Sequence, residues 1–422
     1  MRRLRSIVPP ILLVVVTLFF IGQYKSVFPD TERILSPYGT SKNEDKNDLS
    51  DGSLQTGAKL VESKPESTSE SVPPPNNPQA LIDIPEVPLS DHIQALPEST
   101  SSPPVFEAEF PFQRDLELDL PIEKLKGTSK RKPHNYDINE FNKNAYATFM
   151  ATRNPSLKDP YFLAIHSLIY RVLWSPRSRT EKHPFVVFVA DFVTPEQRQL
   201  LSGTGAIVRE LAPLEWNPNV EGVQHRWKDL FAKLNMWNET EFSRILFLDA
   251  DAFPTTNIDA MFDIAPVQNC VAEKLQLDDL LLDGSSACEP YVFAGVPQDP
   301  FNDTDININV GSMVFNPSVQ MHKRLLQNYV KTDRYNCLMA EQAFLNWQFN
   351  VNGPFPATRL EREYGGFFPQ EDEQGKLKVV HEKIWAEKGW LKEEWEHVWK
   401  EMLDFYSSPD FLQKRNEDGN FF

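Results

Sequence analysis

Two carboxylates separated by one small residue, Asp249 and Asp251 around Ala250, are the chemically most suggestive feature of this sequence. Carboxylates held so close together repel each other and lose hydration unless a cation or hydrogen-bond donors compensate them. Oxygen ligands with an open coordination sphere suit Mg²⁺ or Mn²⁺, which can also bind a diphosphate. Alternatively, the pair caps a helix or ends a strand in water.

An apolar run at residues 244–248 stands directly before this pair, with polar residues on its other side and Pro254 soon after. Short runs of branched and aromatic residues predict a buried strand. Ligands of open α/β sheets bind outside the carboxyl ends of the strands. Asp249 and Asp251 are therefore predicted at the edge of the sheet where a ligand would bind.

Cations and a histidine are available to the same site. A predicted helix at residues 226–237 carries Arg226 and Lys233, which fall on nearly one face about 10 Å apart and could hold a nucleotide diphosphate. Alternatively, Lys233 pairs with Asp229 one turn earlier. His381, at the end of a predicted strand at residues 377–381, is a possible third metal ligand, although a lone histidine after a strand is usually structural.

Strands and helices alternate in the part of the chain that must position these groups. The predicted strands are residues 146–150, 184–190, 206–208 and 244–248, and the predicted helices between them are residues 161–174, 195–201 and 226–237. Such crossovers are right-handed and connect parallel strands. The pattern predicts an α/β fold, a single Rossmann-like domain with a mainly parallel sheet.

The rest of the globular part is less regular. Residues 268–305 show no periodic pattern, and residues 308–317 predict a strand interrupted by Gly311, where a backbone or ligand can approach closely. Helices are predicted at residues 318–331 and 339–349. A C-terminal apolar stripe predicts a helix that packs on its own domain rather than on a membrane or partner: Leu391, Trp395, Val398, Trp399, Met402 and Tyr406.

Composition divides the chain into four segments. Residues 1–6 contain three arginines and are predicted to form a cytoplasmic tail. Residues 7–24 carry no charge and would span about 27 Å as a helix, so we expect a transmembrane signal anchor, with a cleaved signal peptide as the alternative. Residues 25–134, rich in Pro, Ser and acidic residues, predict a disordered lumenal stem. Residues 135–422 form the predicted globular domain.

Charge, cysteines and glycosylation motifs indicate which ligands the protein does not bind and in which compartment it lies. The net charge of −17 argues against nucleic-acid binding, because no basic stripe is available to replace phosphate counterions. Of three cysteines, Cys270 and Cys288 are the most plausible disulfide pair, with Cys337 left over; three free thiols are the alternative. The sequons at Asn238 and Asn302 are consistent with a lumenal domain.

Several motifs, taken in order, resemble glycosyltransferase family 8 over about residues 146–390. Residues 309–311 resemble the family's Asn-Ser-Gly strand with Val310 replacing serine, and Glu341 replaces the aspartate of its Asp-Gln-x-x-Leu-Asn helix. The other matching motifs are the opening nucleotide-binding strand at residues 146–153, the Thr-Lys-Leu-x-x-Trp helix at residues 232–237, the Asp-x-Asp signature at residues 247–251 and the histidine strand at residues 379–381.

The resemblance implies a GT-A fold and a metal-dependent transferase that uses a UDP-sugar and retains anomeric configuration. Asp249, Asp251 and His381 would hold Mn²⁺ or Mg²⁺, which neutralises the departing diphosphate. The implied catalytic residues are Lys233, Glu341 and Gln342. The implied nucleotide-sugar-binding residues are Thr148, Thr152, Arg226, Lys233, Asp249, Ala250, Asp251, Asn309, Gly311 and Lys388.

The anchor and stem further resemble fungal Golgi members of the family, among them an α-1,4-N-acetylglucosaminyltransferase. This layout implies a single-pass type II Golgi membrane protein with a lumenal catalytic domain. The implied reaction transfers glucose, galactose or N-acetylglucosamine from a UDP-sugar to a glycan on protein or lipid.

The loop after His381 departs from the family's His-x-x-Gly-x-x-Lys-Pro-Trp pattern, and Lys388 is only a shifted candidate for its lysine. Two other classes remain open. Haloacid-dehalogenase phosphatases also carry Asp-x-Asp after an apolar strand, but they usually have Thr or Val at the position of Phe253. A lumenal sugar-binding protein without activity is the second alternative.

Overall fold

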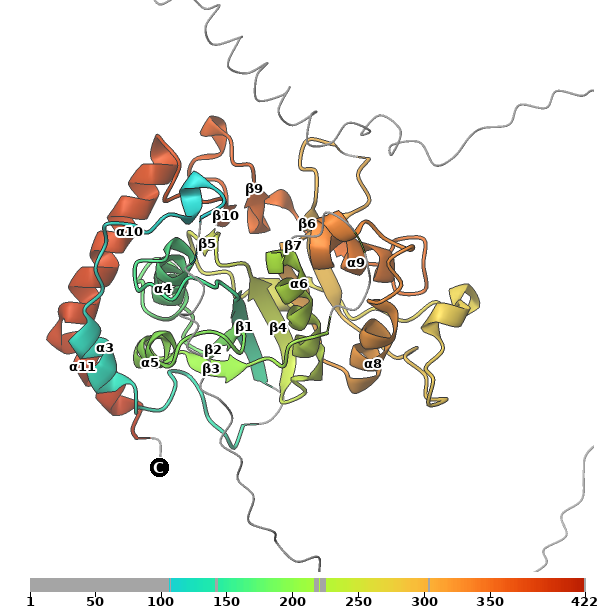
Figure 1. Ribbon diagram of the computed structural model, residues 1–422, viewed down its shortest axis with the longest axis horizontal. Helices are drawn as coiled ribbons and strands as arrows, with labels where there is room; N and C mark the ends of the chain where they lie inside the picture. The colour runs from blue at the N-terminus through green and yellow to red at the C-terminus, as the bar shows by residue number, and fades with distance from the viewer. Residues whose placement is uncertain are drawn as a thin grey trace, which may run out of the picture. The chain divides into compact units, whose positions relative to one another are not determined.

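The computed structural model describes residues 106, 108–140, 143–215, 220, 225–302 and 304–420, all within one unit of the chain, residues 97–422. Within these residues, seven strands form the central sheet in the order β3-β2-β1-β4-β7-β6-β8 (Figure 1). They are β1 (Lys143–Met150), β2 (Phe185–Val189), β3 (Ile207–Glu210), β4 (Phe242–Leu248), β6 (Phe293–Pro297), β7 (Ile308–Phe315) and β8 (Thr358–Arg359). In this sheet β7 runs against its two neighbours and the other pairings are parallel. The predicted α/β fold with a mainly parallel sheet is confirmed.

Burial explains why these sequences form parallel strands. Ile245, Leu246, Phe247 and Leu248 of β4 are fully buried between β1 and β7. Strands covered on both faces read as continuous apolar runs, which made β4 recognisable from its sequence. β6 lies within residues 268–305, where we expected no regular structure. It is formed by pairing with β7 rather than by any periodicity of its own.

A second, smaller sheet carries the histidine to the edge of the first. It has the order β5-β10-β9, with β5 (Ala252–Pro254), β9 (Gly366–Phe367) and β10 (Val379–His381). β10 pairs antiparallel with β5, which places His381 opposite Ala252. It also pairs parallel with β9, which places His381 beside Phe367. Ala252, which follows Asp251 in the chain, is thus the strand partner of His381, so the pairing brings His381 close to Asp251.

Helices flank the central sheet on both sides (Figure 1). To the left in the figure, α4 (Pro160–Leu173) and α5 (Pro195–Gly203) lie between the sheet and an outer layer of α3 (Ile122–Thr128), α10 (Trp390–Ser407) and α11 (Pro409–Glu417). To the right lie α6 (His225–Leu230), α8 (Val319–Asn328) and α9 (Ala340–Gln348), and a short α7 (Met261–Ile264) packs on β4. Asp159, Thr194 and Ser318 cap the starts of α4, α5 and α8 with side-chain hydrogen bonds.

The helix predicted at residues 226–237 changes type within its length. It is α-helical as α6 and then continues as a 3₁₀ segment, η2 (Phe231–Asn238). A 3₁₀ segment has three residues per turn, so the side-chain directions differ from those of an α-helix. Trp237 stacks on Phe315 of β7 at 4.1 Å between ring centroids. Lys233 lies between the end of α6 and Trp237. Tertiary packing of this segment therefore sets the direction of the Lys233 side chain.

The folded part starts before residue 135, where composition predicted the end of the stem. α3 packs on α5 so closely that a Cβ on Gly203 would lie 2.1 Å from the carbonyl oxygen of Leu125. Leu125 is fully buried, and Thr128 donates to the Gly203 carbonyl over 2.8 Å. The boundary at residue 135 is therefore too late for this segment. Its apolar contacts are few and widely spaced, so composition alone did not reveal them.

The predicted membrane anchor at residues 7–24 lies outside the described residues, as does the stem up to residue 105. In the part of the chain that the structure describes, none of the helices is both long and apolar enough to cross a bilayer.

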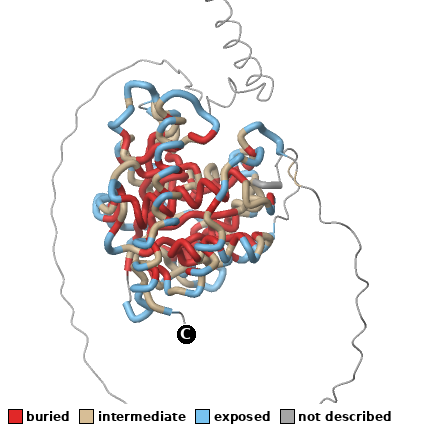
Figure 2. Tube along the Cα trace, turned by 90° about the vertical axis from the view of Figure 1, so that its left-hand side faces the viewer, coloured by how far each residue is buried: buried red, intermediate tan, exposed pale blue. Residues whose placement is uncertain are grey.

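One apolar core runs through the sheet and its helices, and buried residues fill the interior of the trace in Figure 2. The predicted C-terminal stripe is buried in this core, and Tyr406 packs edge-on against Tyr170 of α4. Arg171 of α4 also reaches Glu394 of α10 at 2.6 Å. A disulfide joins Cys270 and Cys288, as the more plausible alternative predicted.

Candidate metal centre and active site

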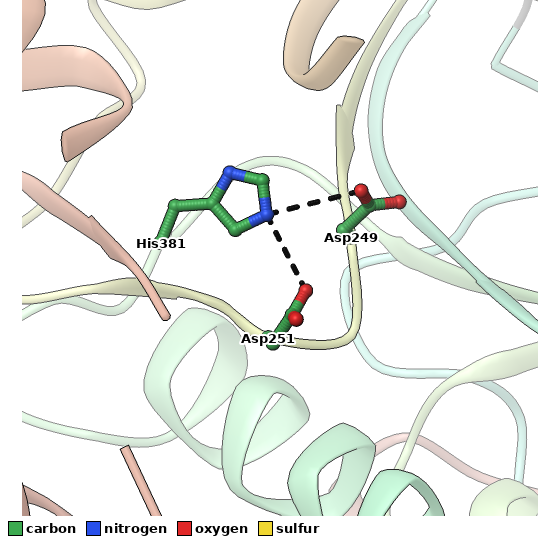
Figure 3. Close-up of side chains that lie close together, drawn as sticks. All are labelled: Asp249, Asp251 and His381. Carbon is green, nitrogen blue, oxygen red and sulfur yellow. Dashed lines mark ion pairs between the residues drawn. The ribbon is translucent and has the colours of Figure 1, made fainter. Parts of the chain in front are cut away.

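Three residues from three strand ends meet at the carboxyl edge of the sheet (Figure 3). Asp249 follows β4, Asp251 precedes β5, and His381 is the last residue of β10. His381 Nε2 lies 3.4 Å from Asp251 Oδ1 and 3.9 Å from Asp249 Oδ2. One ligand atom from each residue lies within 4.8 Å of the others. The structure thus brings together the three metal ligands that the resemblance implied.

Gly311 of β7 leaves the space in which these side chains meet. A Cβ at this position would lie 2.2 Å from His381 Cε1 and 2.6 Å from Asp249 Oδ2. No side chain fits at such distances unless the histidine or the aspartate moves. The glycine in the middle of β7 is therefore explained by the close approach of two metal-ligand candidates.

Lys233 bridges two carboxylates from its buried position in η2. Its Nζ lies 2.8 Å from Asp249 Oδ1 and 2.7 Å from Glu341 Oε1. Burial disfavours the charged amine, but the charges of Asp249 and Glu341 outweigh burial and raise the pKa of Lys233. Burial raises the pKa of Glu341 even though Lys233 opposes this shift. The alternative pairing with Asp229 is wrong, because Asp229 accepts two hydrogen bonds from Arg153 instead.

Lys383 pairs with the second aspartate, which sequence reasoning missed. Its Nζ lies 3.0 Å from Asp251 Oδ2. Burial acts to raise the pKa of Asp251, but Lys383 and His381 outweigh burial and lower that pKa well below its usual range. The ammonium of Lys383 also lies 5.3 Å from the ring centroid of Phe112, whose carbonyl accepts from Trp385 Nε1. The position of Lys383 two residues after His381 was the signal that could have revealed it.

Each aspartate therefore has one oxygen bound to a lysine and the other facing the imidazole. Two carboxylate oxygens and one imidazole nitrogen form a donor set that Mn²⁺ accepts. The gap left by Gly311 keeps the three groups free to converge, so the residues present fit a divalent ion. Nδ1 of His381 is buried and has no hydrogen-bond partner among the described residues, unlike most ligand histidines.

A cavity of about 360 Å³ opens beside this cluster. Its walls come from the carboxyl end of β1, the start of α4, the end of α6 and the two aspartates of the metal-ligand candidates, and they include Thr152, Asp159 and Glu341. The N-terminal residues Phe106, Glu109 and Gln113 complete the wall. Part of the segment predicted as stem, residues 25–134, thus contributes to the candidate site.

The predicted nucleotide-binding residues do not all reach this cavity. Thr152 and Ala250 line it, as do Lys233 and both aspartates. Thr148 does not, because its side chain is fully buried within β1. Lys388 is exposed and is not part of the cavity wall. The side chain of Arg226 lies outside the described part of the chain.

Asn309 and Gln342 support β7 instead of lining the cavity. The Asn309 carboxamide oxygen accepts from the Gly311 amide over 2.8 Å. The Gln342 carboxamide oxygen accepts from the Val310 amide over 3.3 Å. Both contacts hold the backbone at Gly311, the position that faces His381, and at the residue before it. These two residues therefore act on the shape of the site, whereas Glu341 reaches it directly.

Sequence reasoning also missed Arg153 and Asp159. Arg153 lies on the wall between this cavity and a neighbouring one of about 330 Å³ at the ends of β2 and β3. Asp159 is 1% exposed, accepts from the Phe162 amide and from the Thr152 hydroxyl, and has a pKa that burial raises to about 7. Asp159 also fits the pattern of a helix N-cap before a proline, so its sequence signal indicated structure rather than a site.

The two predicted glycosylation sites lie at the surface. Asn238 is exposed at the end of η2, and Asn302 is exposed in the loop before β7. Asn302 Oδ1 accepts from the backbone amide of Thr304 within the sequon itself.

The fold and the cluster are those of an α/β protein whose candidate ligand site lies at the carboxyl edge of its sheet. No family model matches the chain. Galactinol synthase 4 of Arabidopsis thaliana is 30% identical over 255 residues, which cover 58% of this chain and 73% of that protein. An uncharacterized protein of Schizosaccharomyces pombe is 28% identical over 266 residues, covering 54% and 70%.

Among solved structures, the glycosyltransferase GlyE of Streptococcus pneumoniae TIGR4 aligns at 15% identity over 64% of each chain. Its TM-score of 0.38 is too low to support an argument. The galactinol synthase relationship does support one. The chain belongs to glycosyltransferase family 8, and the resemblance seen in its motifs is confirmed. Membership of a glycosyltransferase family leaves no support for the phosphatase alternative.

Proposed function

We propose that this protein is a metal-dependent family 8 glycosyltransferase that transfers a hexose from a UDP-sugar and retains its anomeric configuration. The observation that supports this proposal best is the convergence of Asp249, Asp251 and His381 beside the cavity. When bound there, Mn²⁺ or Mg²⁺ would supply a positive charge that stabilises the diphosphate leaving group.

The lysines would act on the same negative charge. Lys233 is buried, positively charged and held between Asp249 and Glu341, so it can orient a phosphate without first losing a hydration shell. Lys383 is paired with Asp251. In this proposal Lys383, rather than Lys388, binds the diphosphate. Thr152 and Arg153, which follow the carboxyl end of β1, line the cavity and would contact the nucleoside.

Transfer breaks the bond from the anomeric carbon to the diphosphate and forms a bond to an acceptor oxygen, whose proton is released. Glu341 borders the cavity and lies 2.7 Å from the Lys233 ammonium, slightly closer than Asp249 at 2.8 Å. It can contact the donor sugar or act as a nucleophile, the two roles that retention of configuration allows.

The donor sugar is glucose, galactose or N-acetylglucosamine in this proposal. Several of the relatives are named galactinol synthases. Galactinol is a galactosyl derivative of myo-inositol. UDP-galactose is therefore the first donor to test, and myo-inositol belongs beside glycans among the acceptors.

We further propose that the protein is a type II membrane protein of the Golgi with a lumenal catalytic domain. The charge-free segment at residues 7–24 supports the anchor. The Cys270–Cys288 disulfide supports an oxidising compartment, where such bonds persist. The exposed sequons at Asn238 and Asn302 agree with this location.

The decisive test uses a secreted chain beginning at residue 97, incubated with UDP-glucose, UDP-galactose and UDP-N-acetylglucosamine. Release of UDP, with and without Mn²⁺, identifies the donor, and binding of UDP measured by calorimetry reports the site without turnover. We expect Mn²⁺-dependent UDP release with one sugar, and its loss in Asp251→Asn. If neither UDP nor Mn²⁺ binds, the protein is instead an inactive member of the family.

A further inference from the structure

Three aromatic rings form a row that starts at the metal-ligand candidate His381. The ring of Phe367, in β9, lies 5.2 Å from the His381 ring between centroids. The ring of Phe368 follows at 4.0 Å from that of Phe367. Neither phenylalanine lines the cavity assigned to the donor. The row therefore begins at the candidate metal centre and is not part of the donor cavity wall.

Phe368 is an unusual end to this row, because it is both exposed and conformationally strained. Its side chain is 53% exposed, and its φ is +52°. A positive φ costs free energy in any residue with a bulky side chain, and such strain collects at binding sites. An exposed phenylalanine on an ordinary surface would gain nothing from that backbone conformation.

Neighbouring side chains hold this conformation in place. The Arg362 guanidinium donates to the Phe367 carbonyl over 2.9 Å and is itself bound by Glu373 at 2.6 Å. Gln370 Nε2 donates to the Phe368 carbonyl over 2.8 Å. Strained residues persist only where the surroundings determine them in this way. The segment thus holds an aromatic face in the solvent next to the candidate metal centre.

We propose that Phe368 is an acceptor-binding residue, and that its ring stacks on the face of a pyranose or cyclitol ring that presents its hydroxyl toward the metal centre. The C–H groups on one face of such a ring form an apolar surface that an aromatic face covers well, while its hydroxyl groups remain in water. This inference rests on the proposed function, because it assigns the second substrate of the same reaction.

The test measures acceptor binding separately from donor chemistry. The secreted chain, saturated with UDP and Mn²⁺, is titrated with methyl glycosides of glucose, galactose and N-acetylglucosamine and with myo-inositol, and saturation-transfer NMR reports which of them binds. The variants are Phe368→Ala, Phe368→Trp, which keeps an aromatic face, and Leu282→Ala as the control. Leu282 is 94% exposed and lies in the loop closed by the disulfide between Cys270 and Cys288.

We expect at least one compound to bind the unmodified chain, about tenfold weaker binding in Phe368→Ala, and near-normal binding in Phe368→Trp and in Leu282→Ala. UDP binding and UDP-sugar hydrolysis should be unchanged in all variants. Equal acceptor binding in Phe368→Ala, or no binding of any compound to a chain that binds UDP, would overturn the inference. Loss of UDP binding in the unmodified chain would instead overturn the proposed function.

Because Phe368 carries a positive φ, a Phe368→Gly variant separates binding from folding. Glycine adopts this conformation without strain, so the variant should unfold at the same or a higher temperature than the unmodified chain. It lacks the ring and should bind the acceptor as weakly as Phe368→Ala. Normal acceptor binding by this stable variant would also overturn the inference.

Discussion

The ammonium of Lys233 and the carboxylate of Glu341 form an ion pair of 2.7 Å in which both side chains are almost completely buried. Removing one partner of a buried pair leaves a charge that nothing compensates, whereas removing both is much less costly. Lys233→Met should therefore lower the free energy of unfolding by about 3 to 5 kcal/mol. Urea titration of the single variants and of Lys233→Met with Glu341→Gln measures this coupling.

The double variant should regain much of that stability and should remain inactive, because the cation beside Asp249 is still missing. A Lys233→Met chain as stable as the unmodified one would show that the pair does not contribute as its burial indicates.

Gly311 should be irreplaceable for metal binding. In Gly311→Ala the new methyl group would overlap His381 and Asp249, so these side chains must move apart. Mn²⁺ affinity, measured by electron paramagnetic resonance, should fall at least about tenfold, as expected when a ligand is displaced. Gly127→Ala is the matched control, since nothing lies within 4 Å of the added atom. An unchanged Mn²⁺ affinity in Gly311→Ala would show that the three side chains do not bind the ion together.

Lys383 should compete with a divalent ion for the charge of Asp251. Lys383→Met removes a cation 3.0 Å from that carboxylate, so Mn²⁺ alone should bind more tightly. UDP should bind more weakly in the same variant, because one positive charge beside the diphosphate is lost. Lys388→Met should change neither affinity, since Lys388 is exposed and, in the described structure, forms no ion pair with Asp249 or Asp251. If Lys388→Met weakens UDP binding and Lys383→Met does not, Lys388 is the diphosphate ligand.

Asp159 should make stability depend on pH. Burial raises the pKa of its carboxyl from 3.8 to about 7, so the folded state binds the extra proton between these values. The contribution of the bound proton to the free energy of unfolding is complete below pH 3.8 and is lost as the pH rises toward 7. Asp159→Asn stays neutral and can still cap α4. The free energy of unfolding of Asp159→Asn, measured relative to that of the unmodified chain, should therefore increase as the pH rises from 3.8 to about 7. The increase is at most about 1.4 kcal/mol per pH unit. A difference that does not change with pH would mean that the carboxyl titrates normally.

The segment before residue 135 should be required for folding. A chain that begins at residue 135 loses α3 and exposes the surface of α5 that it covers, so it should aggregate or unfold at a lower temperature than a chain that begins at residue 97. Leu125→Ala tests the same contact within the longer chain and should cost about 2 to 5 kcal/mol. Ile138→Ala, at a position that is 71% exposed, is the control. If the chains that begin at residues 97 and 135 are equally stable, residues 97–134 belong to the stem and not to the folded domain.

The parts of the site that could be predicted are those recorded in local sequence patterns. Apolar runs such as that of β4 indicate buried strands by themselves, and a carboxylate directly after such a run must lie at a sheet edge. The parallel sheet and the position of Asp249 and Asp251 follow from such local patterns, and the family resemblance follows from several short motifs taken in order.

The sequence by itself determined that this chain forms an α/β sheet with two carboxylates at its edge. Tertiary structure decided what surrounds them, because those neighbours come from distant parts of the chain. The pairing of β5 with β10 delivers His381, the switch from α6 to η2 directs Lys233, and the packing of the N-terminal segment places Phe112 against Lys383. Contacts between segments so far apart depend on how the layers pack, which no local periodicity records.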